Sequence, residues 1–339
     1  CWVALKMTSD IAESSAALDV DSARSHAVLP TDFEMPAEGV HIRLGDWPTI
    51  QEARQARIRM PALHAFARAN RLDVETIAPT ERRLGIVAAG KSYADVRQAL
   101  ADLGLGDGML RALGVAVYKV GLVWPLEPQG LRAFVRGCPD LLVVEEGRAV
   151  LEPQIKEVLY ALPEGQRPGL YGKHDPDGAE LFPSFGELTP LAIARVLAAR
   201  IGALSGAPPM DTRLAFLEAA RTRAKPAGFL RTPYFCSGCP HNTGTRVPDG
   251  SMALAGIGCH FMAQWMDRST QSWTHMGAEG ITWTGMAPFT DTPHMFVNLG
   301  DGTYYHSGFL AIRQAVAAGA PVTYKILYND AVAMTGGQP

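Results

Sequence analysis

The alternation of apolar runs and polar turns near the end of the chain predicts a strand, a helix and a second strand. Residues 295–299 form an apolar run of strand length, and a Gly-Asp-Gly turn follows them. Apolar residues then recur at helical spacing from Phe309 to Val316, until Gly319 ends the helix. The apolar run 322–327 predicts the second strand. Such a unit is expected to be right-handed and parallel, with both carboxyl strand ends at one edge of the sheet.

A similar alternation earlier in the chain predicts another α/β unit. It is expected to contain strands and helices in turn, at residues 84–90, 93–103, 115–120, 131–135 and 141–145. Alternating strands and helices favour a parallel sheet, so the expected fold class is α/β. Further amphipathic helices are predicted at 61–72, 150–160, 191–204 and 212–223.

Changes in composition divide the chain into five expected segments. Residues 1–20 are expected to be the tail of a preceding domain, and 21–82 to be a connector with short helices. The compact α/β unit occupies 83–160, and a segment rich in Gly, Pro and helices, 161–228, links it to the last module. That module, 229–339, is expected to be truncated at its C-terminus, because the last residue falls inside a motif.

Composition excludes several classes of protein. The 339 residues are 47% hydrophobic, which suffices for the buried cores of two or three domains. The formal net charge of -3 gives no reason to expect nucleic acid or a membrane surface as a partner. No apolar run reaches the length of a membrane span and no signal peptide opens the chain, so a cytoplasmic protein is expected.

Two polar residues follow the two strands near the end of the chain. Asp301 and Asn329 are 28 positions apart (329 minus 301), and the parallel unit is expected to bring them to one sheet edge. Their hard oxygen atoms suit Mg²⁺, and the neighbouring glycines allow backbone N–H groups to approach a diphosphate. Taken alone, the Gly300-Asp301-Gly302 turn is also typical of a residue that caps the next helix.

Gly-Asp-Gly with an Asn about 28 residues later resembles the thiamine diphosphate motif. The C-terminal run Ala-Met-Thr-Gly-Gly-Gln-Pro, 333–339, and the run Cys-Ser-Gly-Cys-Pro-His, 236–241, extend this resemblance. With them, the chain resembles the indolepyruvate ferredoxin oxidoreductases, a branch of the 2-oxoacid:ferredoxin oxidoreductase superfamily. It departs at Asp330, where many thiamine enzymes have a second Asn.

The resemblance implies a transketolase C-terminal-like domain at 83–160 and a thiamine diphosphate-binding domain at 229–339. It implies that the backbone carbonyl of Ala331 completes the Mg²⁺ ligands provided by Asp301 and Asn329. The other residues implied to contact the cofactor are Cys236, Gly238, Cys239, His241, Gly258, Gly277, Gly300, Gly302, Thr303, Thr335 and Gly336.

Three of the five cysteines, Cys236, Cys239 and Cys259, are grouped in sequence. In the wider superfamily, cysteines at the matching places ligate a [4Fe-4S] cluster together with a fourth cysteine further along, which this chain lacks. The residues alone also allow Zn²⁺ held by the three cysteines and His241 or His260, or thiols that line a cofactor pocket without metal. The iron-sulfur interpretation is favoured.

His241 is the candidate catalytic residue, because a histidine beside a Cys and Gly motif can transfer protons; His275 and His306 are weaker candidates. Each of them is otherwise a structural hydrogen-bonding group. Glu279, in a Met-Gly-Ala segment that resembles the family's, is either a residue behind the cofactor or a solvated charge at a helix start. An aromatic substrate pocket or plain core packing accounts for Trp265, Trp273 and Trp283.

Residues 85–92 match the phosphate-loop pattern, with Gly85, Gly90, Lys91 and Ser92 at the required positions. The four residues between the glycines are apolar and continue the preceding strand. A strand-helix turn is therefore favoured over nucleotide binding.

The resemblance implies oxidative decarboxylation of aryl 2-oxoacids such as indolepyruvate to acyl-CoA, with electrons passed through iron-sulfur centres to ferredoxin. The partners would be the 2-oxoacid, coenzyme A and ferredoxin, and the full-length protein would be a homo-oligomer. An activating glutamate and the fourth cluster cysteine are expected outside the chain, so the fragment alone is expected to be inactive. The alternatives are a non-oxidative thiamine diphosphate-dependent decarboxylase or carboligase, and a non-catalytic zinc module.

Overall fold

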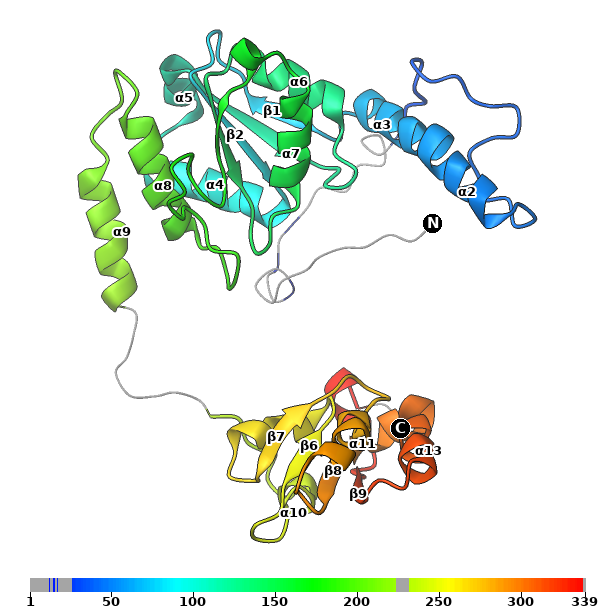
Figure 1. The fold of residues 1–339 in the computed structure, drawn as a ribbon. Coiled ribbons are helices and arrows are strands. Elements are labelled where there is room, and N and C mark those ends of the chain that lie inside the picture. The colour runs from blue at the N-terminus through cyan, green and yellow to red at the C-terminus, as the bar shows by residue number, and fades with distance from the viewer. Residues whose placement is uncertain (1–11, 13–14, 16, 18–25, 224–231, 338–339) are drawn as a thin grey trace. The chain divides into compact units, whose positions relative to one another are not determined.

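The computed structural model describes residues 12, 15, 17, 26–223 and 232–337. The chain divides into two compact units, residues 1–225 and 226–339 (Figure 1). Both units contain a sheet of mainly parallel strands with helices packed on it, so the predicted α/β class is confirmed. The tail expected at residues 1–20 lies almost entirely outside the described residues.

The first unit has a five-stranded sheet in the order β1-β3-β2-β4-β5. All neighbouring pairs are parallel except β1 with β3. The strands are β1 Val74–Ile77, β2 Leu84–Ala89, β3 Val115–Val120, β4 Asp140–Val144 and β5 Gly169–Tyr171. The three strands expected from the sequence, β2, β3 and β4, agree with it to within one residue at each end.

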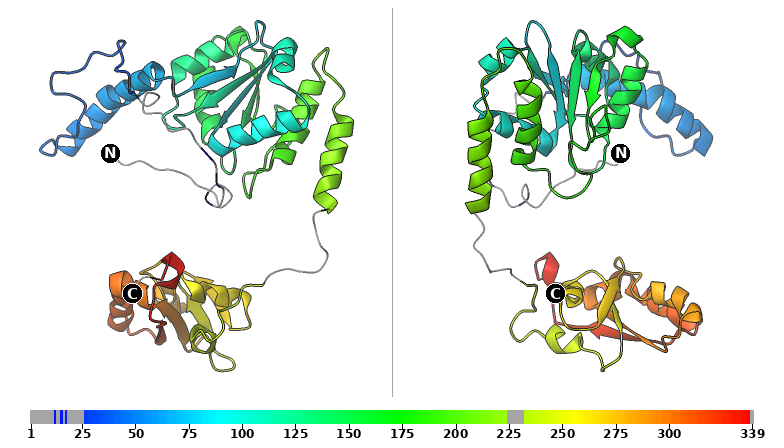
Figure 2. Two further views of the ribbon diagram at one scale, coloured as in Figure 1. Left: turned by 180° about the vertical axis from the view of Figure 1, so that it is seen from behind. Right: turned by 60° about the vertical axis from the view of Figure 1, so that its left-hand side comes forward.

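Helices cover both faces of this sheet (Figure 2). They are α4 Gly90–Asp102, α5 Asp107–Leu113, α6 Pro128–Val135, α7 Leu151–Tyr160 and α8 Pro190–Gly202. A further helix, α9 Asp211–Arg223, lies on the outer side of α8 (Figure 1). On one face, Leu100 of α4 and Leu197 of α8 are buried in one apolar cluster. On the other face, Phe134 of α6 and Ile155 of α7 belong to a second cluster. The unit is therefore a sheet between two helical layers.

The first unit extends beyond the predicted 83–160 on both sides. Strand β1 lies in the expected connector, and β5 lies in the expected linker. Both are edge strands of three or four residues with few fully buried positions, so they carry almost no periodic signal. Helix α8 also lies in the expected linker, yet Leu197 is fully buried in the core of the unit.

The helix expected at 61–72 begins earlier than predicted. Helix α2 Pro48–Arg54 continues through a π-helical turn, η2 Gln55–Arg59, into α3 Met60–Ala69. Helix α2 starts at Pro48 because the N–H group of the first helical residue has no partner within the helix, so proline loses no hydrogen bond at this position.

The phosphate-loop match is a strand-helix turn, as favoured from the sequence. Lys91 Nζ donates to Asp95 Oδ2 at 2.8 Å, to Glu146 Oε2 at 3.2 Å and to the Leu188 carbonyl at 3.1 Å. The ammonium group is thus engaged with three oxygen atoms of the protein, which leaves it no donor directed to a phosphate.

The second unit has a four-stranded sheet in the order β7-β6-β8-β9, in which every pair is parallel. The strands are β6 Ala253–Ala255, β7 Thr270–Trp273, β8 Met295–Gly300 and β9 Val322–Leu327. The predictions for β8 and β9 are confirmed, whereas β6 and β7 were not predicted. The helical segments are α10 His241–Gly244, η4 Cys259–Trp265, α11 Ile281–Met286, η5 Ala287–Phe289, α12 Asp301–Thr303, η6 Tyr304–Gly308, α13 Phe309–Ala317 and η7 Ala333–Thr335.

The core of the second unit contains Leu254, Met295 and Val297 of the sheet together with Trp283 of α11. Trp283 is 2% exposed, and its Nε1–H donates to the Pro321 carbonyl at 3.0 Å. Core packing therefore accounts for Trp283, as the sequence favoured. By contrast, Trp265 and Trp273 are more than half exposed and contact the ring of Phe261 edge to face.

Across the described residues, none of the helices is both long enough and apolar enough to span a membrane.

Candidate active site at the carboxyl edge of the second sheet

The strand order of the second unit reverses between β6 and β8, which defines a switch point at the carboxyl edge of its sheet. The chain runs from β6 to β7 on one side and then places β8 on the other side of β6. Because the order reverses there, the loops that follow β6 and β8 leave in opposite directions, and ligands of open α/β sheets bind in the space between them. Gly258 and Cys259 follow β6, and Asp301 follows β8.

The structure brings Asp301 and Asn329 together, as the sequence predicted. Strands β8 and β9 pair in register up to Gly300 and Leu327, so both chain segments leave the sheet at the same level. Asp301 Oδ2 accepts a hydrogen bond from the backbone N–H of Asn329 at 3.4 Å. Asp301 Oδ1 accepts one from the N–H of Gly302 at 2.8 Å. The carboxylate is therefore fixed at the junction of the two loops.

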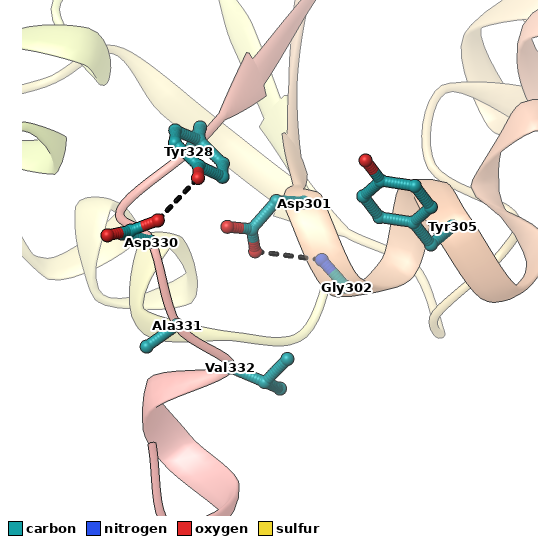
Figure 3. Close-up of a pocket in the computed structure, with 7 residues that line it drawn as sticks. All are labelled: Asp301, Gly302, Tyr305, Tyr328, Asp330, Ala331 and Val332. Carbon is teal, nitrogen blue, oxygen red and sulfur yellow. Dashed lines mark hydrogen bonds between the residues drawn. The ribbon is translucent and has the colours of Figure 1, made fainter. Parts of the chain in front are cut away.

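A pocket of about 490 Å³ opens beside this carboxylate (Figure 3). Figure 3 shows Asp301 between two tyrosines that line the pocket. Tyr305 lies on one side of it, and Tyr328 lies on the other side, on the chain segment that leaves β9. The lining residues are Asp301, Gly302, Tyr305, Tyr328, Asp330, Ala331 and Val332. Three of the predicted site residues, Asp301, Gly302 and Ala331, thus line one cavity.

Asp330 shows why the departure from the thiamine motif is tolerated. Its φ is 65°, in the left-handed region, which Asp and Asn enter more readily than other residues with a side chain. Its Oδ1 accepts a hydrogen bond from the Tyr328 hydroxyl at 2.5 Å, and this bond raises the pKa of Tyr328. An Asp can therefore replace the Asn without a change of the backbone.

Two buried histidines lie close to Asp301. His241 is 4% exposed and His260 is 1% exposed. Burial lowers the pKa of His241, against the opposing charge of Asp301. Burial, and then the neighbouring His241, lower the pKa of His260 to about 4, again against Asp301. Both imidazoles are therefore neutral at physiological pH, and a neutral ring has one nitrogen that can accept a proton.

His260 was considered from the sequence only as a zinc ligand. Its Nε2 is buried without a hydrogen-bond partner among the described residues. The ring lies against Gly300, since a Cβ on that glycine would be 3.4 Å from Cε1 of His260. The signal that could have found it is its place at the switch point, directly after Gly258 and Cys259.

Cys236 and Cys239 belong to one turn, in which the N–H of Cys239 donates to the Cys236 carbonyl at 3.0 Å. Burial raises the pKa of Cys259, and the thiols of Cys239 and Cys236 raise it further. Cys239 Sγ lies 3.5 Å from Nδ1 of His241, so the cysteine loop adjoins the buried histidines. Within the described ranges, no group of three His, Cys, Asp or Glu side chains is arranged to hold a metal ion. The iron-sulfur and zinc assignments stay predictions.

The remaining predicted residues lie on the loops around this edge. Thr303 is buried in the first turn after Asp301, whereas His275 and His306 are exposed. His306 Nδ1 lies 2.6 Å from Ser307 Oγ. The other predicted contacts belong to exposed or half-buried turns, or to the final 3-10 turn and the residue after it: Gly238, Gly258, Gly277, Thr335 and Gly336.

Glu279 is completely buried, which excludes the prediction of a solvated charge at a helix start. Its Oε2 accepts a hydrogen bond from the N–H of Gly277 at 2.8 Å, and its Oε1 has no partner among the described residues. Burial raises the pKa of this carboxyl group, although hydrogen bonds and the nearby His275 and His306 act in the other direction.

Comparisons with known proteins agree with the resemblance seen in the sequence. Residues 75–224 match the family model of the indolepyruvate oxidoreductase domain. The indolepyruvate oxidoreductase subunit IorA of Thermococcus kodakarensis is 28% identical over 280 residues, which cover 76% of this chain and 40% of that protein. The IorA subunit of Methanothermobacter marburgensis is 29% identical over 294 residues, which cover 83% of this chain and 43% of that protein.

A solved structure of 2-oxoglutarate:ferredoxin oxidoreductase from Magnetococcus marinus, with 2-oxoglutarate, coenzyme A and succinyl-CoA bound, is also similar. The likeness covers 46% of this chain and 24% of that chain at 18% identity, with a TM-score of 0.31. Because the TM-score is so low, this likeness gives no information about the site.

These matches show what the chain is similar to: residues 75–224, less than half of its length, match the indolepyruvate oxidoreductase domain. The chain is also similar to the IorA subunits, in agreement with the resemblance seen in the sequence, and spans about 40% of the length of these curated relatives. The family match falls in the first unit, whereas the pocket beside Asp301 lies in the second.

Proposed function

We propose that the second unit binds the diphosphate of thiamine diphosphate through Mg²⁺, and that the whole protein is a 2-oxoacid oxidoreductase. The observation that carries the proposal is the meeting of Asp301 and the Asn329 segment at the edge of the pocket. Asp301, the side-chain oxygen of Asn329 and the carbonyl of Ala331 would hold the metal ion. Such a set of oxygen atoms, completed by phosphate and water, suits Mg²⁺.

The residues fit a metal ion that would carry the diphosphate, because the charged side chains that line the pocket, Asp301 and Asp330, are both carboxylates. Gly302 is the middle residue of the short helix α12, and its half-buried backbone lies against Val332, so there is little room for a side chain. Its N–H group is bonded to the Asp301 carboxylate, which holds that carboxylate in place. Thiamine diphosphate supplies a carbon nucleophile for 2-oxo groups and an electron sink for decarboxylation. The protein would supply position and charge.

His241 would exchange protons at the pocket edge, because its neutral ring is buried between Cys239 and Asp301. Cys236, Cys239 and Cys259 would provide three ligands of a [4Fe-4S] cluster, with the fourth from outside the chain. The turn that joins Cys236 and Cys239, and the effect of both thiols on the pKa of Cys259, support this assignment. The cluster would receive single electrons and pass them to ferredoxin.

The substrate class follows from the relatives. The curated relatives are named indolepyruvate oxidoreductase, which supports an aryl 2-oxoacid such as indolepyruvate as substrate. Coenzyme A as acyl acceptor, ferredoxin as electron acceptor, a homo-oligomeric full-length protein and a cytoplasmic location belong to the same proposal. A non-oxidative thiamine enzyme would share Asp301 and Asn329 but would contain neither iron nor acid-labile sulfide, so metal and sulfide analysis separates the two.

The proposal is tested by substitution of the central carboxylate. Asp301→Ala should weaken Mg²⁺-dependent binding of thiamine diphosphate by at least ~100-fold, because it removes the charged metal ligand. Isothermal titration calorimetry of the chain measures this binding. Asp291→Ala, an exposed aspartate in the loop before β8, is the matched control and should bind like the wild type. Equal binding by the Asp301 variant and the wild type would remove the assignment.

A further inference from the structure

Glu279 is a buried acid at the candidate site to which the proposed function gives no role. It follows β7 in the loop 274–280, whose backbone begins by pairing with β6 through a bond from Thr274 N–H to the Ala255 carbonyl at 3.1 Å. Its side chain is 0% exposed. Full burial of a glutamate without an ion-pair partner is rare, because the charged form loses its hydration.

Two glycines enclose the carboxyl group. Gly256, directly after β6, has no room for a side chain, because a Cβ there would overlap Oε1 of Glu279. Gly277 donates its N–H to Oε2 at 2.8 Å, and a Cβ on Gly277 would lie 2.7 Å from Ser307 Oγ. Gly277 has a φ of 94°, which a glycine adopts without strain. Glu279 therefore joins the end of β6 to the loop after β7 and, through Gly277, to η6, whose Tyr305 lines the pocket.

The surroundings of the carboxyl group favour its neutral form. Among the described residues no lysine or arginine forms an ion pair with it, and Oε1 has neither solvent nor a hydrogen-bond donor. The titratable groups nearby are His275 on the same loop, His306 on η6 and Tyr324 on β9. The two histidines are exposed to solvent, and Tyr324 donates to the backbone carbonyl of Glu279 at 2.9 Å and not to its side chain.

We propose that Glu279 is held as a neutral carboxylic acid and that in this form it positions the loop 274–280 at the edge of the site. Oε2 then acts as the carbonyl oxygen that accepts from Gly277, and Oε1 carries the proton. Loss of that proton places an unsolvated charge between two backbone segments, so it loosens the loop. Thiamine diphosphate binding then weakens as pH rises, a part of the inference that rests on the proposed function.

Three variants separate the neutral acid from a packing role. Glu279→Gln reproduces the neutral shape, with an amide oxygen for Gly277 and no charge at any pH. Glu279→Ala removes both the bond and the packing. Glu157→Gln, on the exposed side of α7, is the control for loss of a glutamate charge at the surface.

The sign of the pH effect follows from burial. A carboxyl pKa that is higher in the folded than in the unfolded chain means that the folded chain binds more protons. Its contribution to stability is then present at pH below 4.5 and is lost as pH rises toward the folded value. Wild type should therefore lose stability relative to Glu279→Gln between pH 5 and pH 8. The stability of the second unit in Glu157→Gln should change with pH as it does in wild type.

Hydrogen exchange followed by mass spectrometry measures both effects in the whole chain. Peptides from β8 report the unfolding of the second unit, and peptides from 274–280 report the loop. At pH 8, the exchange of β8 in wild type should be about tenfold faster than in Glu279→Gln, because the charge that then forms on the buried carboxyl group destabilises the second unit. At pH 5 the two exchange rates should be closer to each other. In Glu279→Ala the loop should exchange roughly tenfold faster than in wild type at pH 5, as for one lost hydrogen bond.

If the exchange rate of β8 in wild type, divided by that in Glu279→Gln, is the same at pH 5 and pH 8, the proposal that Glu279 is a neutral acid is wrong. Unchanged exchange of 274–280 in Glu279→Ala would overturn the positioning role. Calorimetry then links the loop to the cofactor: the affinity of wild type for thiamine diphosphate, divided by that of Glu279→Gln at the same pH, should be lower at pH 8 than at pH 5, and this ratio cancels the titration of the diphosphate itself. If no variant binds the cofactor, the proposed function fails, while the exchange data still decide the state of Glu279.

Discussion

The two units have the same kind of sheet but use its switch point differently. In the first unit the strand order reverses between β2 and β4, and Lys91 and Glu146 lie there. Glu146 Oε2 accepts from Lys91 and from the backbone N–H of Leu188, so the segment around Leu188 is bonded to both. In the second unit the reversal lies between β6 and β8, and there Nε2 of His260 is buried without a partner in the described part of the chain.

This difference shows what topology decides and what side chains decide. Parallel strands bring loops to one edge in both units. In the first unit, Lys91, Glu146 and the Leu188 segment bond one another at the switch point, which stabilises the unit. In the second unit, several buried polar atoms are unpaired among the described residues, His260 Nε2 at the switch point among them, and such atoms lower stability unless a ligand or water satisfies them.

The largest effect expected from this comparison follows removal of the central cation in the first unit. Lys91→Met removes the ammonium group that Asp95 and Glu146 share, and the lysine side chain is only 15% exposed. The free energy of unfolding of the first unit should fall by roughly 2–3 kcal/mol, since a partly buried carboxylate loses its counter-charge. Urea unfolding followed by hydrogen exchange in β2 and β4 measures this.

The control for Lys91→Met is Arg148→Met, at an exposed arginine on the loop after β4. It should leave the unfolding of the first unit unchanged within ~0.5 kcal/mol. Binding of thiamine diphosphate should be equal in both variants. A loss of cofactor binding in Lys91→Met would mean that the first switch point also serves the ligand, and the comparison would fail.

A smaller effect is expected at Glu152, the counterpart of Glu279 in the first unit. Both carboxyl groups pack against a glycine, but Glu152 accepts from Lys156 Nζ at 2.6 Å and from the N–H of Lys173 at 2.8 Å. Burial acts to raise the pKa of Glu152, and these partners outweigh it and lower the pKa. Its stabilisation is therefore present above pH 4.5 and is lost as pH falls through the lower folded value.

Glu152→Gln should destabilise the first unit by ~1 kcal/mol at pH 7, and the loss should shrink toward pH 4. The pH trend is opposite to that expected for Glu279→Gln in the second unit. Unfolding of each unit at several pH values, again read from hydrogen exchange, compares the two. If the effects of Glu152→Gln and Glu279→Gln on stability change with pH in the same direction, the hydrogen-bond partners of these two buried acids do not set their charge states.

The sequence predicted the three interior strands of the first sheet, the strands β8 and β9 of the second sheet, and the meeting of Asp301 and Asn329 at one sheet edge. The apolar runs that became β8 and β9 are long enough to be recognised, and their parallel connection places Asp301 beside Asn329 without further information. The strands of three or four residues, such as β6, were missed because they contain too few positions to show a period.

The roles of Glu279 and His260 could not be predicted for a different reason. Both residues are polar, and their burial depends on segments distant in sequence: Gly256 adjoins Glu279, and Gly300 adjoins His260. A sequence pattern reports which face of one element is apolar, but it does not report which loop covers a polar side chain. The pKa of each group follows from that cover, so its charge state was also beyond prediction.

The smallest effect concerns Asn298, and its sign distinguishes two reasons for an unpaired buried group. Asn298 lies in the middle of β8, is 0% exposed, and has both amide atoms without partners among the described residues. If the amide is unsatisfied, Asn298→Leu should stabilise the second unit by up to ~1 kcal/mol, because an apolar group of similar volume has no bonds to lose. We expect this result, with hydrogen exchange of β9 as the measure. A destabilised variant would instead show that water satisfies the amide. A variant that is more stable but no longer binds thiamine diphosphate would show that Asn298 serves the site at the expense of stability.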